Sequence, residues 1–171
     1  ITLPAFAEFV EVALGGRVVS QVYDEGRSFD VTVKASDASR NDMERIGDQA
    51  EDIAEIVAFL DGRQAENDAL LKEMAKAVIQ MVTESVDAYV KCDIMLAKKV
   101  IAADDVVDEQ FARVKQSLIG KIAADPADGE YALDLLMIAK YYERIGDHAT
   151  NIAEWVIYSV TGTHKDEITL T

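Results

Sequence analysis

The sequence has few of the residues that most catalytic and thiolate-metal sites need. Of its 171 residues one is cysteine and two are histidine, so Cys92 has no partner for a disulfide or for a zinc–thiolate cluster. No Ser–His–Asp set, glycine-rich phosphate loop or Glu-x-x-His pair occurs. These absences argue against a hydrolase, a nucleotide-binding protein and a ferritin-like oxidase.

Long apolar runs are missing as well. No run approaches the roughly 20 residues that a membrane span needs, and nothing resembles the basic and apolar regions of a signal peptide. Together with the lone cysteine, this predicts a reduced, cytoplasmic setting with no direct membrane insertion.

Basic residues are scarce. Seventeen Lys and Arg residues stand against 32 Asp and Glu residues, which gives a net charge of −15. Such a surface repels phosphate backbones, so no nucleic-acid partner is expected, and it attracts cations or a basic protein surface. Solubility alone would also account for this charge.

What the sequence does contain is helical periodicity. Half of the residues are hydrophobic, and they recur at steps of three and four. The pattern predicts helices over residues 40–61, 68–101, 104–123 and 130–161, the second bent or broken near Lys91–Asp93. Because the links between them are short, the last three helices should form an antiparallel bundle.

The first 38 residues follow another pattern. A short helix is expected near the start, before Gly15. Phe29, Val31 and Val33 then alternate with polar residues after the turn sequence DEGR, which predicts a β-hairpin over residues 17–34. The expected fold is mainly α, an antiparallel helical bundle with an N-terminal hairpin.

One acidic pattern is written twice, 99 residues apart: ERIGDQAEDIAE (44–55) and ERIGDHATNIAE (143–154). On a helix, positions four apart lie on one stripe, where like charges repel. Arg45 and Arg144 face elsewhere, so each stripe is an array of oxygen ligands without an obvious in-helix counter-charge. The stripes are Glu44, Asp48 and Asp52 in the first copy, and Glu143, Asp147 and Asn151 in the second.

A further acidic pair lies at Asp104 and Asp108, near the expected start of another helix. Aspartate is favourable at a helix N-terminus without any ligand. If this helix packs beside the helix of Glu143 and Asp147, however, four carboxylates would converge. Such a site admits iron, manganese, magnesium or zinc.

The repeat also contains one glycine in each copy, Gly47 and Gly146. Glycine costs about 1 kcal/mol relative to alanine inside a helix, so a reason for it is expected. A small residue lets a neighbouring backbone approach closely. A packing notch with no metal nearby explains the glycines as well as a ligand site does.

Three segments resemble the PhoU family of phosphate-signalling adaptors. Residues 132–162 resemble its last helix, and residues 85–114 resemble the two helices before it. Residues 42–57 are similar to the closing helix of its first repeat. The resemblance covers about residues 41–163.

The resemblance implies two three-helix bundles, each with paired E(D)xxxD motifs that bind metal clusters in some members. Asp104/Asp108 and Glu143/Asp147 match both motifs of the second repeat, whereas the first repeat retains only Glu44/Asp48. It further implies a negative regulator of phosphate uptake and phosphate-starvation signalling that is not an enzyme. The partners would be the ATPase of a phosphate ABC transporter and a sensor histidine kinase.

Residues 1–38 depart from the family and resemble a periplasmic segment of heavy-metal efflux transporters of the resistance-nodulation-division type. The helix that follows would lack its usual partners, so its apolar face must be buried by the hairpin, the second bundle or another chain; a homo-oligomer is expected. The expected divisions are residues 1–38, a first-repeat helix at 39–62, a second bundle at 63–163 and a tail at 164–171. The alternative function is a metal–carboxylate helical protein for metal storage or stress response.

Overall fold

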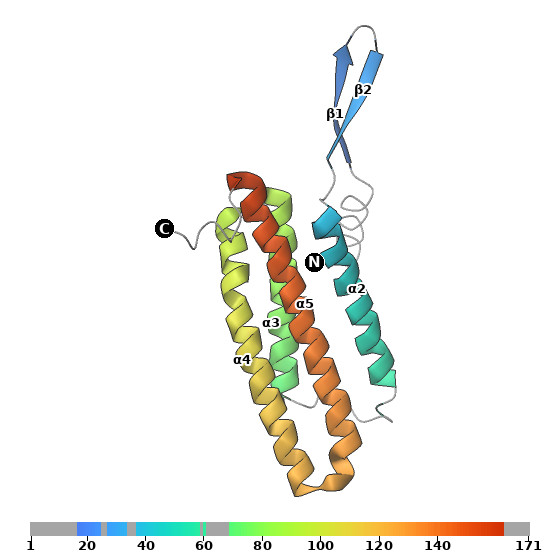
Figure 1. Cartoon of the computed structure of the whole chain (residues 1–171), viewed down its shortest axis with the longest axis vertical. Helices are drawn as coiled ribbons and strands as arrows, with labels where there is room; N and C mark the ends of the chain where they lie inside the picture. Colours follow the sequence, from blue (N-terminus) through green and yellow to red (C-terminus); the bar gives the residue numbers. More distant parts are fainter. Residues whose placement is uncertain (1–16, 25–26, 34–36, 59, 61–68, 163–171) are drawn as a thin grey trace. The chain divides into compact units, whose positions relative to one another are not determined.

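The computed structural model describes residues 17–24, 27–33, 37–58, 60 and 69–162 (Figure 1). The chain divides into two compact units, residues 1–44 and 45–171. The expected helix near the start of the chain and His164 lie outside the described residues. The elements are β1 (Arg17–Asp24), β2 (Arg27–Val33), α2 (Asp37–Ala58), α3 (Ala69–Lys91), α4 (Ile94–Ala124), η2 (Pro126–Asp128) and α5 (Gly129–Thr161).

The first unit contains a two-stranded antiparallel hairpin, where the alternating sequence predicts one. Strand β1 pairs with β2 from Asp24 opposite Arg27 to Arg17 opposite Val33, with an irregular register between Val18 and Ser20. An extra residue in one strand produces such a shift and increases the local twist. The resemblance of this segment to efflux transporters stays a prediction.

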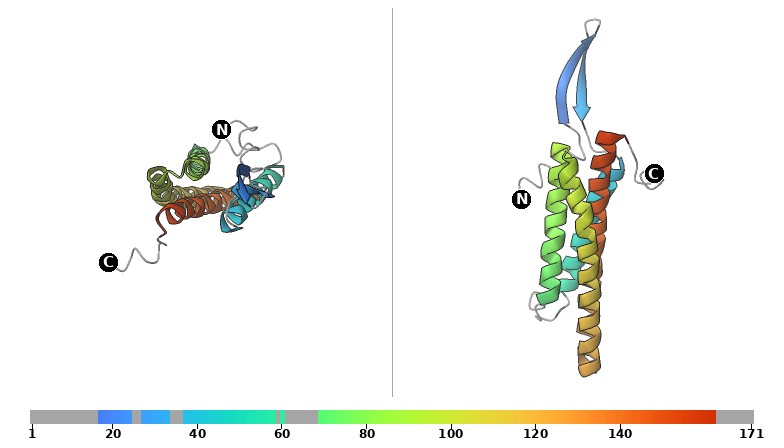
Figure 2. Two further views of the ribbon diagram at one scale, coloured as in Figure 1. Left: turned by 90° about the horizontal axis from the view of Figure 1, so that it is seen from above. Right: turned by 90° about the vertical axis from the view of Figure 1, so that its left-hand side faces the viewer.

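The second unit is built around a bundle of α3, α4 and α5, which pack against one another along their lengths (Figures 1 and 2). On α4, Val100, Val107 and Val114 are buried at intervals of seven, the spacing at which one helix face meets its neighbours. Burial of these apolar side chains is the main stabilising contribution. The helical bundle expected from the sequence is confirmed.

The bend or break expected near Lys91–Asp93 is confirmed and separates two helices, whereas the predicted start of the next helix at residue 104 was wrong. The chain turns at Cys92 and Asp93, and α4 then runs without interruption from Ile94 to Ala124. Cys92 has a positive φ of 51°, and the Asp93 side chain accepts hydrogen bonds from the backbone N–H groups of Met95 and Leu96, at 2.9 and 3.0 Å. This N-cap satisfies two free donors of α4, so the helix starts here and not at residue 104.

The C-terminal ends of α4 and α5 carry residues that stop a helix. Asp125 accepts a hydrogen bond from the Ala127 N–H and introduces the short 3₁₀ helix η2, whose first residue is Pro126. Helix α5 ends at Gly162, which adopts φ 71° and donates its N–H to the Tyr158 carbonyl at 2.8 Å. Glycine adopts this left-handed conformation at little cost.

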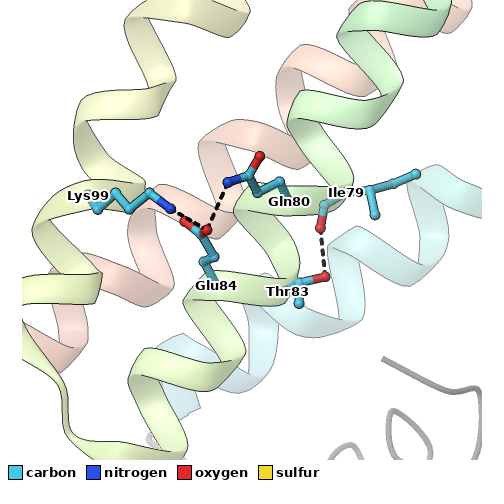
Figure 3. Close-up of polar contacts among 5 residues, drawn as sticks. All are labelled: Ile79, Gln80, Thr83, Glu84 and Lys99. Carbon is cyan, nitrogen blue, oxygen red and sulfur yellow. Dashed lines mark hydrogen bonds and ion pairs between the residues drawn. The ribbon is translucent and has the colours of Figure 1, made fainter.

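Polar contacts also join α3 to α4. Lys99 Nζ on α4 and Gln80 Nε2 on α3 both donate to Glu84 Oε1, at 2.5 and 2.8 Å (Figure 3). Burial by itself would raise the pKa of Glu84, but these two hydrogen bonds and the Lys99 charge lower it. The ionised form of Glu84 therefore helps to fix the α3–α4 hairpin.

None of the described helices is both long and apolar enough to cross a membrane.

Candidate functional site: an acidic face on α4 and α5

Asp104 and Asp108 lie well inside α4 and not at its start. Because α4 begins at Ile94, the favourable effect of a helix N-terminus on acidic residues does not reach them. Their expected position near a helix start was therefore wrong. The absence of helix-dipole stabilisation makes two aspartates one turn apart harder to explain by helix stability alone.

The structure brings these residues close to the acidic residues of α5. The pKa of Asp104 is raised by burial first, and then by the charges of Asp108, Asp105 and Glu143. The pKa of Asp147 is likewise raised by burial, and then by Glu143, Asp104 and Asp108. Asp104, Asp108, Glu143 and Asp147 are thus mutual electrostatic neighbours across the α4–α5 interface. We call these four residues the acidic face.

The acidic face has a counter-charge that the sequence analysis missed. Lys140 Nζ donates to Glu143 Oε2 at 2.5 Å, and the same ammonium group opposes the raised pKa of Asp147. The expectation that the second stripe lacks an in-helix counter-charge was therefore wrong. The sequence did contain a signal for this ion pair, because Lys140 and Glu143 are three residues apart and such residues are neighbours on a helix.

Thr150 is a second group at this face that the sequence analysis did not single out. Its side chain is buried, with 7% of the residue exposed. The hydroxyl lies near Asp104 and favours its ionised form, but Oγ1 has no partner in ordinary hydrogen-bond geometry. A buried oxygen without a partner costs free energy unless some other group approaches it.

The donors at this face are all oxygens, which is the chemistry that hard cations require. In the described part of the chain, however, no three His, Cys, Asp or Glu side chains are gathered closely enough to hold a metal ion. The residues match a cation in donor type and in their negative charge, which Lys140 offsets only in part, but not in their present geometry. Closing them around one ion would require the side chains to rotate.

The remaining predicted residues are not among the groups that raise the pKa of Asp104 and Asp147. Asn151 is exposed on α5, one turn beyond Asp147, and Glu44 and Asp48 are exposed on α2. The acidic groups that raise the pKa of Asp104 and Asp147 belong to α4 and α5. A ligand role for Asn151, Glu44 or Asp48 stays a prediction.

The two repeat glycines differ in their surroundings. A Cβ atom added to Gly146 would lie 3.6 Å from Val107 Cγ1 and 3.8 Å from Met81 Cε, whereas one added to Gly47 would meet nothing within 4 Å. Gly146 thus packs against side chains of α4 and α3 and not against a neighbouring backbone. The close backbone approach expected from the glycines was wrong for both positions.

The repeat also places an equivalent pair of residues in contact. Gln49 Nε2 on α2 lies 3.3 Å from His148 Nε2 on α5, and both residues are buried. His148 follows Asp147 directly in the sequence, and its ring nitrogen makes this contact. Its role here is to connect α2 with α5.

Similarity to known proteins follows the same part of the chain. Residues 71–156, from α3 to α5, match the family model described as "PhoU domain". The chain is 36% identical over 129 residues to the "Phosphate-specific transport system accessory protein PhoU homolog 1" of Thermotoga maritima, covering 74% of this chain and 56% of that protein. The "Phosphate-specific transport system accessory protein PhoU homolog" of Clostridium acetobutylicum is also 36% identical, over 73% of this chain and 58% of that protein.

A solved structure agrees with the sequence matches. The crystal structure of PhoU from Pseudomonas aeruginosa superposes with a TM-score of 0.68 and 35% identity, over 73% of this chain and 61% of that chain. The present chain thus spans a little over half the length of the relatives it matches.

Proposed function

This chain belongs to the PhoU family, and on that premise we propose that it is a regulatory accessory protein of phosphate uptake, without enzymatic activity. In this proposal it acts in the cytoplasm as a negative regulator of phosphate uptake and phosphate-starvation signalling. Its partners are the ATPase of a phosphate ABC transporter and a sensor histidine kinase.

The observation that carries the proposal is the match of residues 71–156, most of the α3–α5 bundle, to the PhoU domain. The relatives with the same bundle are described as accessory proteins of the phosphate-specific transport system. The net charge of −15 adds that a partner surface should be basic. Because the chain spans only part of those relatives, its partners and activity are inferred from the shared bundle.

The test is complementation together with direct binding. A bacterium that lacks its own PhoU-type protein should express a phosphate-starvation reporter at high phosphate, and this chain should repress it. The purified chain should also bind the transporter ATPase or the kinase. The variant Val107→Asp, which places a charge in the core, is the negative control. The proposal would be contradicted if the folded chain left the reporter unrepressed at high phosphate and bound neither the ATPase nor the kinase.

We further propose that the acidic face binds a hard multivalent cation, with iron, manganese, magnesium and zinc as candidates. Asp104, Asp108, Glu143 and Asp147 would hold it, and the Thr150 hydroxyl lies where it could add a neutral oxygen. A bound cation would supply the positive charge that offsets the repulsion raising the pKa of Asp104 and Asp147.

Cation binding is tested by thermal unfolding with and without each metal. The melting temperature should rise with the metal that binds, because a ligand of the folded state stabilises it. Glu143→Gln with Asp147→Asn should abolish the rise. The matched control is the repeat-equivalent pair on α2, Glu44→Gln with Asp48→Asn, which should retain it. An unchanged melting temperature with all four metals would reject the cation.

A metal-storage or stress-response protein is not favoured as the function. The similarity lies with phosphate-transport accessory proteins, and the one histidine among the described residues, His148, contacts Gln49. Catalytic oxidation and reduction of bound iron by the purified chain would be the result that favours a metal-storage or stress-response function.

A further inference from the structure

The ends of α4 and α5 nearest η2 project beyond α3. Helix α3 begins at Ala69, whereas α4 continues to Ala124 and α5 begins at Gly129. Different views show these two helix ends extending past α3 (Figures 1 and 2). Although the chain has a net charge of −15, this part of it combines two lysines with exposed apolar side chains. Exposed apolar residues gathered on one surface and rimmed by polar ones mark sites of protein contact.

The two lysines meet over one aromatic ring. Lys140 Nζ on α5 lies 5.5 Å from the centroid of the Phe111 ring on α4, and Lys115 Nζ lies 5.9 Å from it. Lys140 also donates to Glu143, whereas the ion pairs found in the described part of the chain include none with Lys115. The ring attracts both ammonium groups. Lys115 therefore lies at a defined place with donors available to an anionic group of a partner.

Exposed apolar side chains continue this surface toward η2. From the contact between Phe111 and Lys140, eight residues along α4 (119 − 111) lead to Ile119, and seven along α5 (140 − 133) lead to Leu133. Such steps return to the same side of a helix and rise by about 10–12 Å, so the two side chains lie at nearly the same level. Ile119 is 52% exposed, and Leu133 and its neighbour one turn away, Met137, are exposed to a similar degree. We call the following residues the docking patch: Lys115, Ile119, Leu133, Met137 and Lys140.

We propose that the docking patch binds a segment of the phosphate transporter's ATPase in which an acidic residue lies among apolar ones. This inference rests on the proposed function and adds the surface through which the partner binds. The apolar side chains of the segment would cover Ile119 and Leu133, and its carboxylate would accept a hydrogen bond from Lys115. A basic residue at that place would bring like charges together, which disfavours a partner by its charge.

The surroundings of the docking patch restrict the partner further. The chain as a whole is strongly acidic, so basic residues should flank the acidic and apolar segment. The ATPase is favoured over the kinase because the matched relatives are described as accessory proteins of the phosphate-specific transport system.

The first test compares two exposed apolar residues of α4, one inside the docking patch and one outside it. Ile119 is 52% exposed and Val106, on another side of the helix, is 51% exposed. Ile119→Asp and Val106→Asp therefore add the same charge at positions of equal exposure. Binding to the purified ATPase, measured by titration calorimetry, should weaken about tenfold or more for Ile119→Asp, as for a central interface residue. It should change less than about twofold for Val106→Asp.

The second test reverses the charge of one lysine in the docking patch. Lys115→Glu should weaken binding to the ATPase about tenfold, because two carboxylates would then face each other. Lys98→Glu, at an exposed lysine near the start of α4, is the matched control and should change the affinity less than about twofold. Circular dichroism checks that all four variants are folded.

Each outcome has a distinct meaning. Weaker binding confined to Ile119→Asp and Lys115→Glu would support the docking patch. Parent-like affinity of both variants, with the parent binding the ATPase, would overturn the inference and leave the proposed function standing. Equal losses in Val106→Asp or Lys98→Glu would also overturn it, since they would show a general effect of charge.

Two further outcomes concern the partner. If the two patch variants lost affinity for the kinase and kept it for the ATPase, the assignment of the ATPase to this surface would be wrong. A folded parent chain that bound neither partner and left the reporter unrepressed would remove the proposed function and this inference together.

Discussion

Single positions of the repeat show how the surroundings decide what a residue does. Gly47 and Gly146 are equivalent in sequence, but Gly146 faces Val107 and Met81, whereas Gly47 faces open space. The distances at Gly146 are those of ordinary van der Waals contact, so one methyl group fits there. A larger side chain does not, because the interior of the bundle is already filled.

Substitutions at the two glycines should therefore agree for alanine and differ for leucine. Gly47→Ala and Gly146→Ala should each raise the free energy of unfolding by about 0.5–1 kcal/mol, through the higher helix propensity of alanine. Gly146→Leu should lower it by about 1–3 kcal/mol through overpacking, and Gly47→Leu should not. Urea denaturation measures all four. An equal effect of leucine at both sites would contradict the described packing.

A second residue-scale prediction concerns pH. The folded state raises the pKa of Asp104 and Asp147, so it binds their protons more tightly than the unfolded state does. The associated stability is present at low pH and is lost as pH rises through the raised pKa values. Without metal, Asp104→Asn with Asp147→Asn should unfold at higher urea concentration than the parent near about pH 7. The difference should vanish near about pH 4, where the unfolded carboxyls protonate; a pH-independent difference would contradict this.

The sequence predicted which residues form the acidic face, but not which other side chains surround them. The four-residue spacing identified Asp104, Asp108, Glu143 and Asp147, and the structure makes them neighbours. Thr150 could not be recognised, because its burial beside Asp104 depends on how α4 and α5 align, which no local pattern encodes. The alignment in turn depends on where α4 begins.

At the scale of elements, the helices were predictable because each has strong apolar periodicity. The α3–α4 boundary was predicted only in part, because a bend or break near Lys91–Asp93 was expected but a new helix was expected to begin only at residue 104. Both sides of the boundary are periodic, so the pattern continues through it. The turn depends on two residues, Cys92 in a left-handed conformation and Asp93 as the N-cap of α4. Neither is a glycine or a proline, which are the strongest signals of a turn.

These two residues should therefore have opposite effects when changed. Asp93→Ala removes the acceptor for two N–H groups of α4 and should lower the free energy of unfolding by about 1 kcal/mol. Asp93→Asn, which also caps well, should lose much less. Cys92→Gly should raise the free energy of unfolding by about 1 kcal/mol, because glycine adopts a positive φ without the strain of a Cβ atom. Denaturant unfolding of the three variants gives the result, and a destabilised Cys92→Gly would rule out strain at this turn.

At the scale of the whole molecule, the first copy of the repeat lacks the cover that the second has. On α5, Ala149, Ala153 and Val156 are buried, Val156 with 2% of its surface exposed. Their counterparts on α2 are exposed, and Val57 has 49% of its surface accessible. An apolar stripe that packs in one copy and is open in the other favours association.

We accordingly expect the chain to self-associate through α2. Multi-angle light scattering at micromolar concentration should give more than the monomer mass, and Val57→Glu should shift the chain towards monomer. Val90→Glu, at an exposed valine of α3, is the matched control and should not. Because α2 is acidic, salt should strengthen the association by screening. A monomer at every concentration and salt level would exclude this interface.

The contact between Gln49 and His148 has a consequence for the origin of the chain. The two residues are 99 positions apart, which is the offset between the copies of the repeat. Equivalent positions meet where two like halves are related by a two-fold axis, and in a dimer of identical chains each such residue meets its own copy. A protein of one repeat would have to place two glutamines or two histidines there. When both halves belong to one polypeptide, the two positions can hold different residues, so the side-chain amide of Gln49 can contact the imidazole of His148.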